Sequence, residues 1–221
     1  MNDLFTRLLA AYGAQGWWPA KTPFEVMVGA LLTQNTTWIQ VERAIERLRA
    51  ADLLRPAPLL DLPVETLAEH IRPAGYPRVK ARRLQALCAW LIASGDLAGL
   101  TDRSTDALRT ELLAVHGVGP ETADSILLYA LGRPVFVIDA YTRRIFSRLG
   151  LITGKESYEA LRRLVESELH TDNPARDYNE LHALIVRHAK TACRVRPLCA
   201  ACCLRMGCSA GQPPLTEGAG R

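Results

Sequence analysis

Apolar residues recur every three to four positions along most of this 221-residue chain. The one strand-like run, 134–138, is short, and strands do not alternate with helices anywhere in the pattern. We therefore expect an all-α fold. The periodicity predicts helices over 22–34, 36–50, 79–94, 104–115, 121–131, 140–150, 157–169 and 176–193.

Local signals indicate how the predicted helices begin and how they are joined. Thr22 and Glu25 have the spacing of a capping box, in which the hydroxyl and the carboxylate each bond an amide of the first turn. Ser104 suits an N-cap. The segments 53–63 and 72–77 are short and rich in proline, so we expect them to be linkers.

Charge and hydropathy narrow the class of protein. The net charge is +4 and the pI about 8.8, which is compatible with a polyanionic partner without establishing one. We find neither an N-terminal apolar run of the signal-peptide type nor a stretch approaching the ~20 apolar residues of a spanning helix. We therefore expect a cytoplasmic protein without a membrane partner.

Cysteine spacing points to a metal site near the C-terminus. Five of the six cysteines lie between positions 193 and 208, and clustered thiols in a reducing compartment indicate metal rather than disulfides. Cys193, Cys199, Cys202 and Cys208 are spaced C-x5-C-x2-C-x5-C, and four thiolates suit a [4Fe–4S] cluster or a zinc ion. Cys88 stands alone in an apolar helix, where we expect a buried small side chain.

The stretch HGVGPETADS, 116–125, joins two predicted helices. Pro120 suits a first helical turn. Gly117 and Gly119 permit positive φ angles, which would leave the amides of the loop, including that of Val118, directed outward. Such amides at a helix N-terminus bind phosphate. A plain corner between two helices is the alternative.

Three motifs, in chain order, resemble those of one family. They are LLTQNTT near the N-terminus, LLAVHGVGPETADSILLYALGRPVFVIDAYTRRIFSRLG, and the cysteine cluster. Together they resemble the helix-hairpin-helix DNA glycosylases of the endonuclease III superfamily, and the resemblance covers residues 1–208. It implies an all-α, two-lobed endonuclease III-like fold with a C-terminal iron–sulfur loop. The implied parts are a helical-barrel domain (21–133) and an iron–sulfur domain (1–20 plus 134–208). The tail (209–221) has little to bury, so we expect it to be disordered.

The resemblance also implies a function. A glycosylase of this kind removes a damaged base in base excision repair: it flips the base out of the duplex and breaks its N-glycosidic bond. The expected partner is double-stranded DNA containing a damaged base. We expect the chain to act as a monomer in the cytoplasm, associated with the nucleoid.

Two acidic residues carry the expected chemistry. By resemblance Asp139 is the catalytic carboxylate, which would stabilise positive charge on the sugar or help a water attack it. Glu121 stands where bifunctional members have a lysine that forms a Schiff base with the sugar. A carboxylate cannot form an imine, so we predict a monofunctional, hydrolytic enzyme. Lys190 could supply an amine instead, although a cation near a helix C-terminus explains it equally well.

Tryptophans suggest the substrate class. Trp17 and Trp18 in GWWPA and Trp38 after LLTQNTT make the chain more similar to the 3-methyladenine DNA glycosylase III branch, whose aromatic rings stack on the flipped base. A purine methylated at N3 or N7 is cationic, and indole faces attract cations. We therefore predict alkylated purines as substrates and place Trp18 and Trp38 ahead of Trp17 in the base pocket. Core packing is the alternative for each ring.

Further residues are predicted to contact DNA. Asn35 matches the residue that fills the gap left by the flipped base, or Gln34 does if the assignment shifts by one; helix capping is the alternative for Asn35. Gly117, Val118 and Gly119 would grip backbone phosphate. Lys80 and Arg83, in the basic run 76–83, would meet phosphates, unless that run is an ordinary solvated face.

By resemblance the cysteine spacing favours iron–sulfur over zinc. The superfamily loop is usually C-x6-C-x2-C-x5-C, so the first interval here is one residue shorter. We assign the cluster to Cys193, Cys199, Cys202 and Cys208, and give Cys203 no ligand role.

Three other functions stay open at this point. One is an endonuclease III proper, with lyase activity on oxidised pyrimidines. Another is a thymine- or adenine-mismatch glycosylase. The third is a non-catalytic DNA-binding scaffold.

Overall fold

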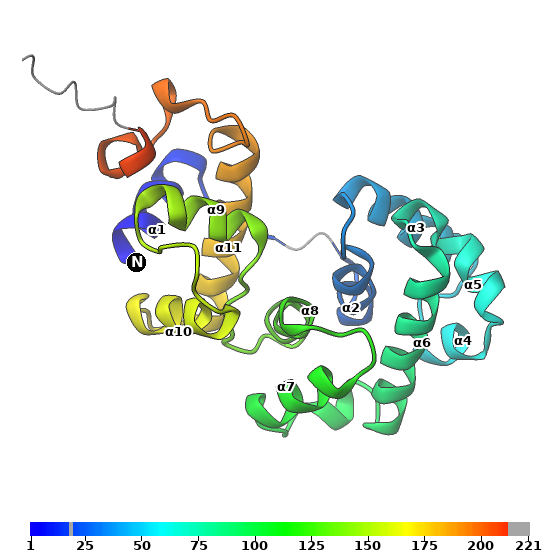
Figure 1. The fold of residues 1–221 in the computed structure, drawn as a ribbon. Helices are drawn as coiled ribbons and strands as arrows, with labels where there is room; N and C mark the ends of the chain where they lie inside the picture. The colour runs from blue at the N-terminus through cyan, green and yellow to red at the C-terminus, as the bar shows by residue number, and fades with distance from the viewer. Residues whose placement is uncertain (18–19, 212–221) are drawn as a thin grey trace, which may run out of the picture. The chain divides into compact units, whose positions relative to one another are not determined.

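The structure, a computed structural model, describes residues 1–17 and 20–211, which are helical in most places and contain no strand (Figure 1). The all-α prediction is confirmed. The α-helices are α1 (Asn2–Tyr12), α2 (Pro23–Leu32), α3 (Trp38–Ala50), α4 (Pro56–Asp61), α5 (Val64–Ile71), α6 (Pro77–Ala93), α7 (Thr105–Ala114), α8 (Pro120–Ser125), α9 (Ala140–Leu149), α10 (Tyr158–Glu168) and α11 (Pro174–Thr191).

The chain divides into two compact units, which we call the first and the second unit. The first combines Met1–Trp17 with Phe136–Arg221, and the second is Trp18–Val135. In the first unit, α11 packs against both α1 and α9. In the second, α6 packs against α4 and α5, and α2 packs against α3.

Each unit has its own apolar core. In the second unit, α2 is buried along almost its entire length, consistent with its nearly continuous apolar sequence. In the first unit, the core takes in fully buried side chains from α9, α10 and α11. These include Phe146, Leu161, Val165, Leu181, Leu184 and Ile185.

Helix starts follow the predicted caps in part. The Thr22 hydroxyl accepts the Glu25 amide at 3.1 Å, and the Ser104 hydroxyl accepts the Ala107 amide at 3.2 Å. The second half of the predicted capping box is wrong. The Glu25 carboxylate is buried and accepts a bond from Arg49 of α3 at 2.6 Å, because a buried carboxylate needs a partner of opposite charge.

The predicted linker 53–63 is wrong as well, because it contains α4. Its prolines do not prevent a helix, since Pro56 occupies the first turn, where the missing N–H has no intrahelical partner anyway. Leu59 is fully buried and ties α4 to the core. Helix α5 also escaped the periodicity analysis, although its Leu67 and Ile71 are completely buried.

The predicted helix 121–131 is α8 continued by a π-helical segment, η3 (Ile126–Ala130). After it the chain runs extended. Val135 belongs to the apolar core of the second unit, and the amide of Phe136 donates to Glu166 of α10 in the first unit at 2.9 Å. Residues 135–138 of the strand-like run are thus a buried connection, and the run pairs with no strand in the described chain.

Lys80 of α6 does not meet phosphates as predicted. Only 2% of the residue is exposed, and its ammonium donates to the carbonyls of Leu32 (2.8 Å) and Ala74 (2.7 Å). These carbonyls lie near the ends of α2 and of the short helix η1 (Arg72–Ala74), where backbone acceptors lack intrahelical donors. Lys80 therefore joins three helices inside the second unit, and its charge is not available at the surface.

Lys80 predicts how stability depends on pH. Burial, assisted by the nearby Arg83, lowers the pKa of Lys80 to about 8. Above pH 8 the folded chain loses this proton while the unfolded chain keeps it up to about pH 10.4. The free energy of unfolding therefore rises with pH in that window. A neutral amine still has two N–H groups for the two carbonyls.

We expect the free energy of unfolding of the wild type, measured with denaturant, to rise relative to that of Lys80→Met by up to about 3 kcal/mol between pH 7 and pH 11. Lys80→Met removes the titration but keeps a long side chain. A difference between the two proteins that stays constant across this range would contradict the assignment.

Candidate active site and DNA-binding elements

The hairpin loop between α7 and α8 is shaped by one glycine. Gly117 has φ +85°, and a Cβ atom there would lie 2.1 Å from Cγ of Arg83. Gly119 has φ −95°, so of the two glycines that permit positive φ, Gly117 is the one that adopts it. A Cβ on Gly119 would meet no atom within 4 Å, which leaves open space beside the backbone at the start of α8. Val118, between them, is buried and anchors the loop in the core.

Gln34 supports this loop from the end of α2. Its amide nitrogen donates to the Gly117 carbonyl at 3.0 Å and to the Thr122 hydroxyl at 2.9 Å. Its amide oxygen accepts Nη1 of Arg83 at 2.7 Å. Two residues predicted to contact DNA, Gln34 and Arg83, therefore hold the hairpin loop in place, and Arg83 fills the space that the missing Cβ of Gly117 leaves.

Asn35 differs from its neighbour Gln34. It is exposed and left-handed, with φ 54°, a conformation that asparagine tolerates better than most residues. The left-handed residue turns the chain out of α2 towards α3. Among the residues predicted to fill the gap beside a flipped base, Asn35 is the one that the structure leaves at the surface.

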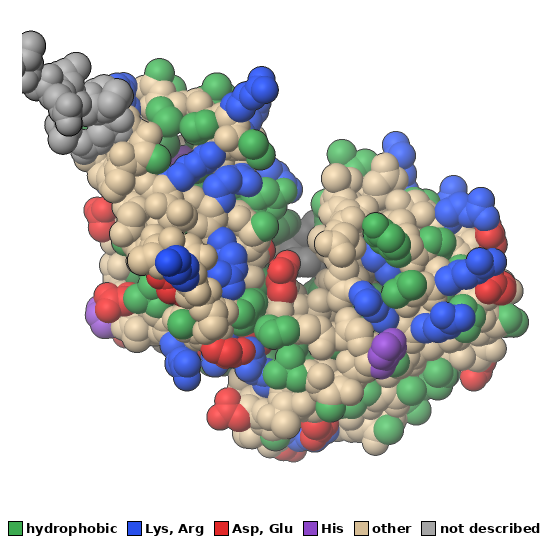
Figure 2. Space-filling model, viewed as in Figure 1, with side chains coloured by type: hydrophobic (Ala, Val, Ile, Leu, Met, Phe, Trp, Pro, Cys, Tyr) green, Lys and Arg blue, Asp and Glu red, His purple; other side chains and the backbone are tan. Residues whose placement is uncertain are grey.

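The basic run 76–83 is divided between the surface and the interior. Arg78 and Arg82 are exposed, and Arg78 pairs with Glu65 of α5 at 2.9 Å. Lys80 is buried and Arg83 supports the hairpin loop. Figure 2 shows further Lys and Arg side chains on the surface of each unit.

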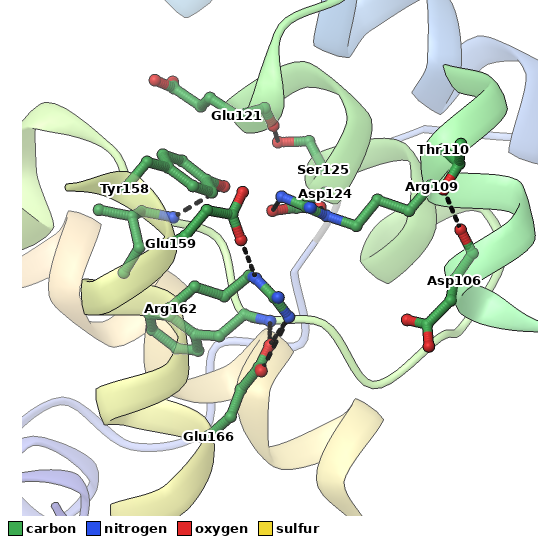
Figure 3. Close-up of polar contacts among 12 residues, drawn as sticks. Asp106, Arg109, Thr110, Glu121, Asp124, Ser125, Tyr158, Glu159, Arg162 and Glu166 are labelled. Carbon is green, nitrogen blue, oxygen red and sulfur yellow. Dashed lines mark hydrogen bonds and ion pairs between the residues drawn. The ribbon is translucent and has the colours of Figure 1, made fainter. Parts of the chain in front are cut away.

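A buried ion pair fixes the angle between α7 and α8. Nε and Nη2 of Arg109 donate to the two carboxylate oxygens of Asp124 at 2.7 and 3.1 Å, and Asp124 is completely buried (Figure 3). Bidentate pairing of this kind is directional as well as strong. Neither residue of this pair was among the predicted site residues; an acid inside the apolar run of the predicted helix 121–131 is the signal that could have revealed the pair.

Glu121 is the second residue of α8 and is exposed. Its carbonyl accepts the Ser125 hydroxyl at 2.7 Å, and in Figure 3 its carboxylate points away from Ser125 and Asp124. A carboxylate in the first turn of a helix is favoured by the helix dipole. The first turn of α8 therefore carries an acid and no amine.

Asp139, in the first unit, is the N-cap of α9. Its Oδ1 accepts both the amide of Thr142 at 2.7 Å and the hydroxyl of Thr142 at 2.9 Å. Thr142 is fully buried, so one side of the carboxylate is held from the interior of the protein.

His182 of α11 lies on the other side of the carboxylate. Its Nε2 is 3.6 Å from Oδ2 of Asp139. The imidazole stacks on the Trp17 ring, with 6.1 Å between centroids and 12° between planes, and meets the edge of Phe136. His182 was not among the predicted site residues, although a histidine in the apolar stripe of a predicted helix was a usable signal.

The surroundings of Asp139 favour its ionised form. Burial by itself would raise the pKa of this carboxyl group. The charge of His182 and the hydrogen bonds from Thr142 outweigh burial, so the pKa of Asp139 lies below its ordinary value.

The residues predicted for the base pocket do not all belong to the same unit. Trp17 stacks on His182 in the first unit. Trp38 is the first residue of α3 and packs, partly buried, against the core of the second unit. Trp18 lies outside the described residues. Lys190 is exposed in the last turn of α11, eight residues beyond His182 and hence ~12 Å further along the helix axis.

The four predicted ligand cysteines line one cavity in the first unit. Cys193, Cys199, Cys202 and Cys208 share it with apolar side chains such as Ile145 and Leu198. Cys203 does not line this cavity, although its Sγ lies 3.9 Å from Nδ1 of the cavity-lining His188. The same nitrogen is 2.8 Å from the Tyr12 hydroxyl oxygen. Cys88, far from this loop in sequence, is fully buried as predicted.

Two arginines of α9 hold the start of this cysteine loop. Arg144 donates to the Cys193 carbonyl at 3.0 Å. Arg148 donates to the carbonyls of Arg194 (2.6 Å) and Val195 (2.9 Å) and to Sγ of Cys193 (3.2 Å). These bonds hold the segment between Cys193 and Cys199, the interval that is one residue shorter than is usual in the superfamily loop.

Among the described residues, no helix is both long enough and apolar enough to cross a membrane.

Comparisons with known proteins agree with this fold. Residues 28–170 match the HhH-GPD superfamily of base excision DNA repair proteins. The chain is 47% identical over 208 residues to MJ1434 of Methanocaldococcus jannaschii, whose name assigns it provisionally to the DNA repair glycosylases; the match covers 93% of this chain and 94% of the relative.

Two solved structures are similar as well. One is a trapped endonuclease III–DNA covalent intermediate, with a TM-score of 0.81 at 25% identity over 95% of this chain and 94% of that one. The other is the H. pylori 3-methyladenine DNA glycosylase MagIII bound to 1,N6-ethenoadenine, with a TM-score of 0.71 at 28% identity over 85% and 96%. The chain therefore belongs to the HhH-GPD superfamily and is a base excision repair DNA glycosylase with an endonuclease III-like fold.

Proposed function

We propose that this glycosylase is monofunctional: it flips an alkylated purine such as 3-methyladenine out of double-stranded DNA and releases it by hydrolysis, acting as a monomer. One observation carries the proposal. An ionised carboxylate, Asp139, is held at the start of α9, while the first turn of α8 carries a carboxylate, Glu121, and no amine.

The hairpin is the proposed grip on the DNA backbone. The open space beside Gly119 would let a phosphate approach the backbone at the start of α8. Gln34 and Arg83 act on DNA indirectly in this proposal, because they hold the loop that the phosphate meets. Asn35, exposed after α2, would fill the space left by the flipped base. Such contacts position the duplex without reading its sequence.

Asp139 is the proposed catalytic residue. Cleavage of a base–sugar bond builds positive charge on the sugar ring, and a fixed carboxylate stabilises that charge or takes a proton from the attacking water. Since Thr142 holds Oδ1, the carboxylate is oriented before substrate arrives. An N3- or N7-alkylated purine leaves as a neutral base, so little acid catalysis is required of the protein.

Aromatic rings are the proposed source of base selection. Trp17, Trp18 and Trp38 are each proposed to contact the flipped base, and Lys190 is the further candidate for the base pocket. Indole faces attract a cationic purine more strongly than a neutral one. The similarity to MagIII, a 3-methyladenine glycosylase solved with a modified purine, supports this substrate class.

The cysteine loop is the proposed site of a [4Fe–4S] cluster. Its four cysteines line one cavity. Four thiolates are the donor set of a [4Fe–4S] cluster and also of a structural zinc ion. The resemblance of the C-x5-C-x2-C-x5-C spacing to the loop of the superfamily favours the cluster.

Held by Cys193, Cys199, Cys202 and Cys208, such a cluster would cross-link the C-terminal loop to Cys193, which closely follows the end of α11. Arg194, Arg196 and Arg205 on the loop are exposed, so the cluster would also fix basic side chains for contact with phosphates.

Asp139→Asn tests the catalytic assignment. Asparagine caps a helix as well as aspartate does, so the variant should fold, but it carries no charge. We expect base release from methylated duplex DNA to fall about 10²- to 10³-fold, with DNA affinity retained. The measurement is single-turnover release of 3-methyladenine. Release at the wild-type rate, or release of oxidised pyrimidines alone, would overturn the proposed function.

Glu121→Lys tests the hydrolytic mechanism. We expect wild-type protein to leave abasic sites that break only after hot alkali and to form no borohydride-trapped adduct with DNA. Glu121→Lys should gain a trapped adduct, because an amine then stands in the first turn of α8. Glu121→Gln is the matched control and should stay hydrolytic. If wild-type protein forms the trapped adduct efficiently and Lys190→Ala does not, the lyase chemistry comes from Lys190 instead.

Cysteine variants test the cluster. We expect about four irons and four acid-labile sulfides per chain, and we expect Cys199→Ser to lose both and to unfold at a lower temperature. Cys203→Ser is the control, because Cys203 does not line the cavity, and it should retain full iron. Zinc without sulfide in the wild type would contradict the assignment.

A further inference from the structure

We propose that His182 is a positioning residue for Asp139: its imidazole, clamped by Trp17 and Phe136, keeps the second carboxylate oxygen in one orientation for the hydrolytic step. The inference rests on the proposed catalytic role of Asp139. It adds a residue that neither the motifs of the sequence nor the comparisons single out.

His182 lies on the buried face of α11. This face includes the buried residues Tyr178, Ile185 and Ala189, and His182 itself is only 5% exposed. Burying a polar ring there costs free energy unless it meets a polar or charged partner, and its Nε2 faces the carboxylate of Asp139 at 3.6 Å.

The neighbouring rings restrict how the imidazole can rotate. Trp17 covers one face in a nearly parallel stack, and Phe136 contacts the ring at 78° to its plane. Phe136 is itself fully buried and also meets the edge of Tyr178. An imidazole between a stacked indole and a fixed phenyl ring has little freedom, so the direction of Nε2 is set before DNA binds.

The two carboxylate oxygens therefore have different partners. Oδ1 accepts two hydrogen bonds from Thr142, as a helix cap requires, and Oδ2 faces His182. With a contact on each oxygen, the carboxylate plane cannot turn freely about its Cβ–Cγ bond. At 3.6 Å the distance between Nε2 of His182 and Oδ2 is longer than that of a hydrogen bond, and catalytic contacts that are long without substrate often shorten when it is bound.

His182 also compensates for the burial of Asp139. Desolvation raises the pKa of that carboxyl group, and His182 and Thr142 together lower it below its ordinary value. Without the imidazole, burial would be opposed by Thr142 alone. The carboxylate would then be both less oriented and less fully ionised.

The experiment compares three variants of the full chain. His182→Leu removes the polar ring and keeps an apolar side chain. His182→Gln keeps an amide donor near the place of Nε2 but never carries a charge. Tyr178→Leu is the matched packing control, because Tyr178 touches the same Phe136 one helical turn earlier and donates its hydroxyl to the Glu166 carbonyl.

The first readout is single-turnover base release from methylated duplex DNA as a function of pH. We expect His182→Leu to lower the rate about 10²-fold, with DNA affinity within about twofold of wild type. The acid limb of its rate profile should move to higher pH, because the pKa of Asp139 rises. His182→Gln should recover part of the rate but keep the shifted acid limb. Tyr178→Leu should leave the acid limb unmoved.

The second readout needs no activity. Titration of the Asp139 carboxyl carbon by NMR should give a pKa that rises in both His182 variants and is unchanged in Tyr178→Leu. If His182→Leu does not fold, His182→Gln carries both measurements.

The inference is overturned if both His182 variants match wild type in rate and acid limb, or if Tyr178→Leu reproduces their defects. It is also overturned if the carboxyl titration does not move. Failure of the proposed function would look different: Asp139→Asn would then release bases as fast as wild type, whatever the His182 variants do.

Discussion

The N-cap of α9 is the interaction on which the proposed catalytic carboxylate, Asp139, depends for its position. Asp139 begins the helix by accepting the amide and the hydroxyl of Thr142, and the same carboxylate is the one that the proposed chemistry uses. A helix cap is a good support for such a group. It orients the carboxylate through backbone geometry, and the helix dipole favours its ionised form. Capping the helix and the proposed catalysis therefore both require an oriented, ionised carboxylate at this position.

The hairpin in the second unit is supported in a comparable way. Gly117 has no side chain, and the Arg83 side chain occupies the space that a Cβ atom would need. Arg83 also donates a hydrogen bond to the amide oxygen of Gln34. The buried pair of Arg109 and Asp124 fixes the helices on either side. None of these contacts has to touch DNA. Together they keep backbone amides in a fixed arrangement, which is what recognition of a phosphate requires.

Helices were predicted well from the sequence where the apolar residues that recur every three to four positions are also the buried ones. Ser104 and Thr22 cap helices as expected, because a cap needs only neighbouring residues. Helix α4 was missed because its prolines indicate a linker when they are read without the buried Leu59. Lys80 was misassigned for a related reason. A lysine in a basic run favours the surface, and only the meeting of three helices supplies the carbonyls that hold it inside.

The sequence by itself determined the helical class, the hairpin with its acid at Glu121, the position of Asp139 and the family, because these depend on periodicity and on residues close together in the chain. The tertiary structure alone decided which side chains meet them. His182 is 43 positions from Asp139, and Gln34 is 83 from Gly117. Periodicity indicates which face of a helix is buried, but it does not indicate which residue of another helix lies opposite. That choice follows from the packing of whole helices against one another.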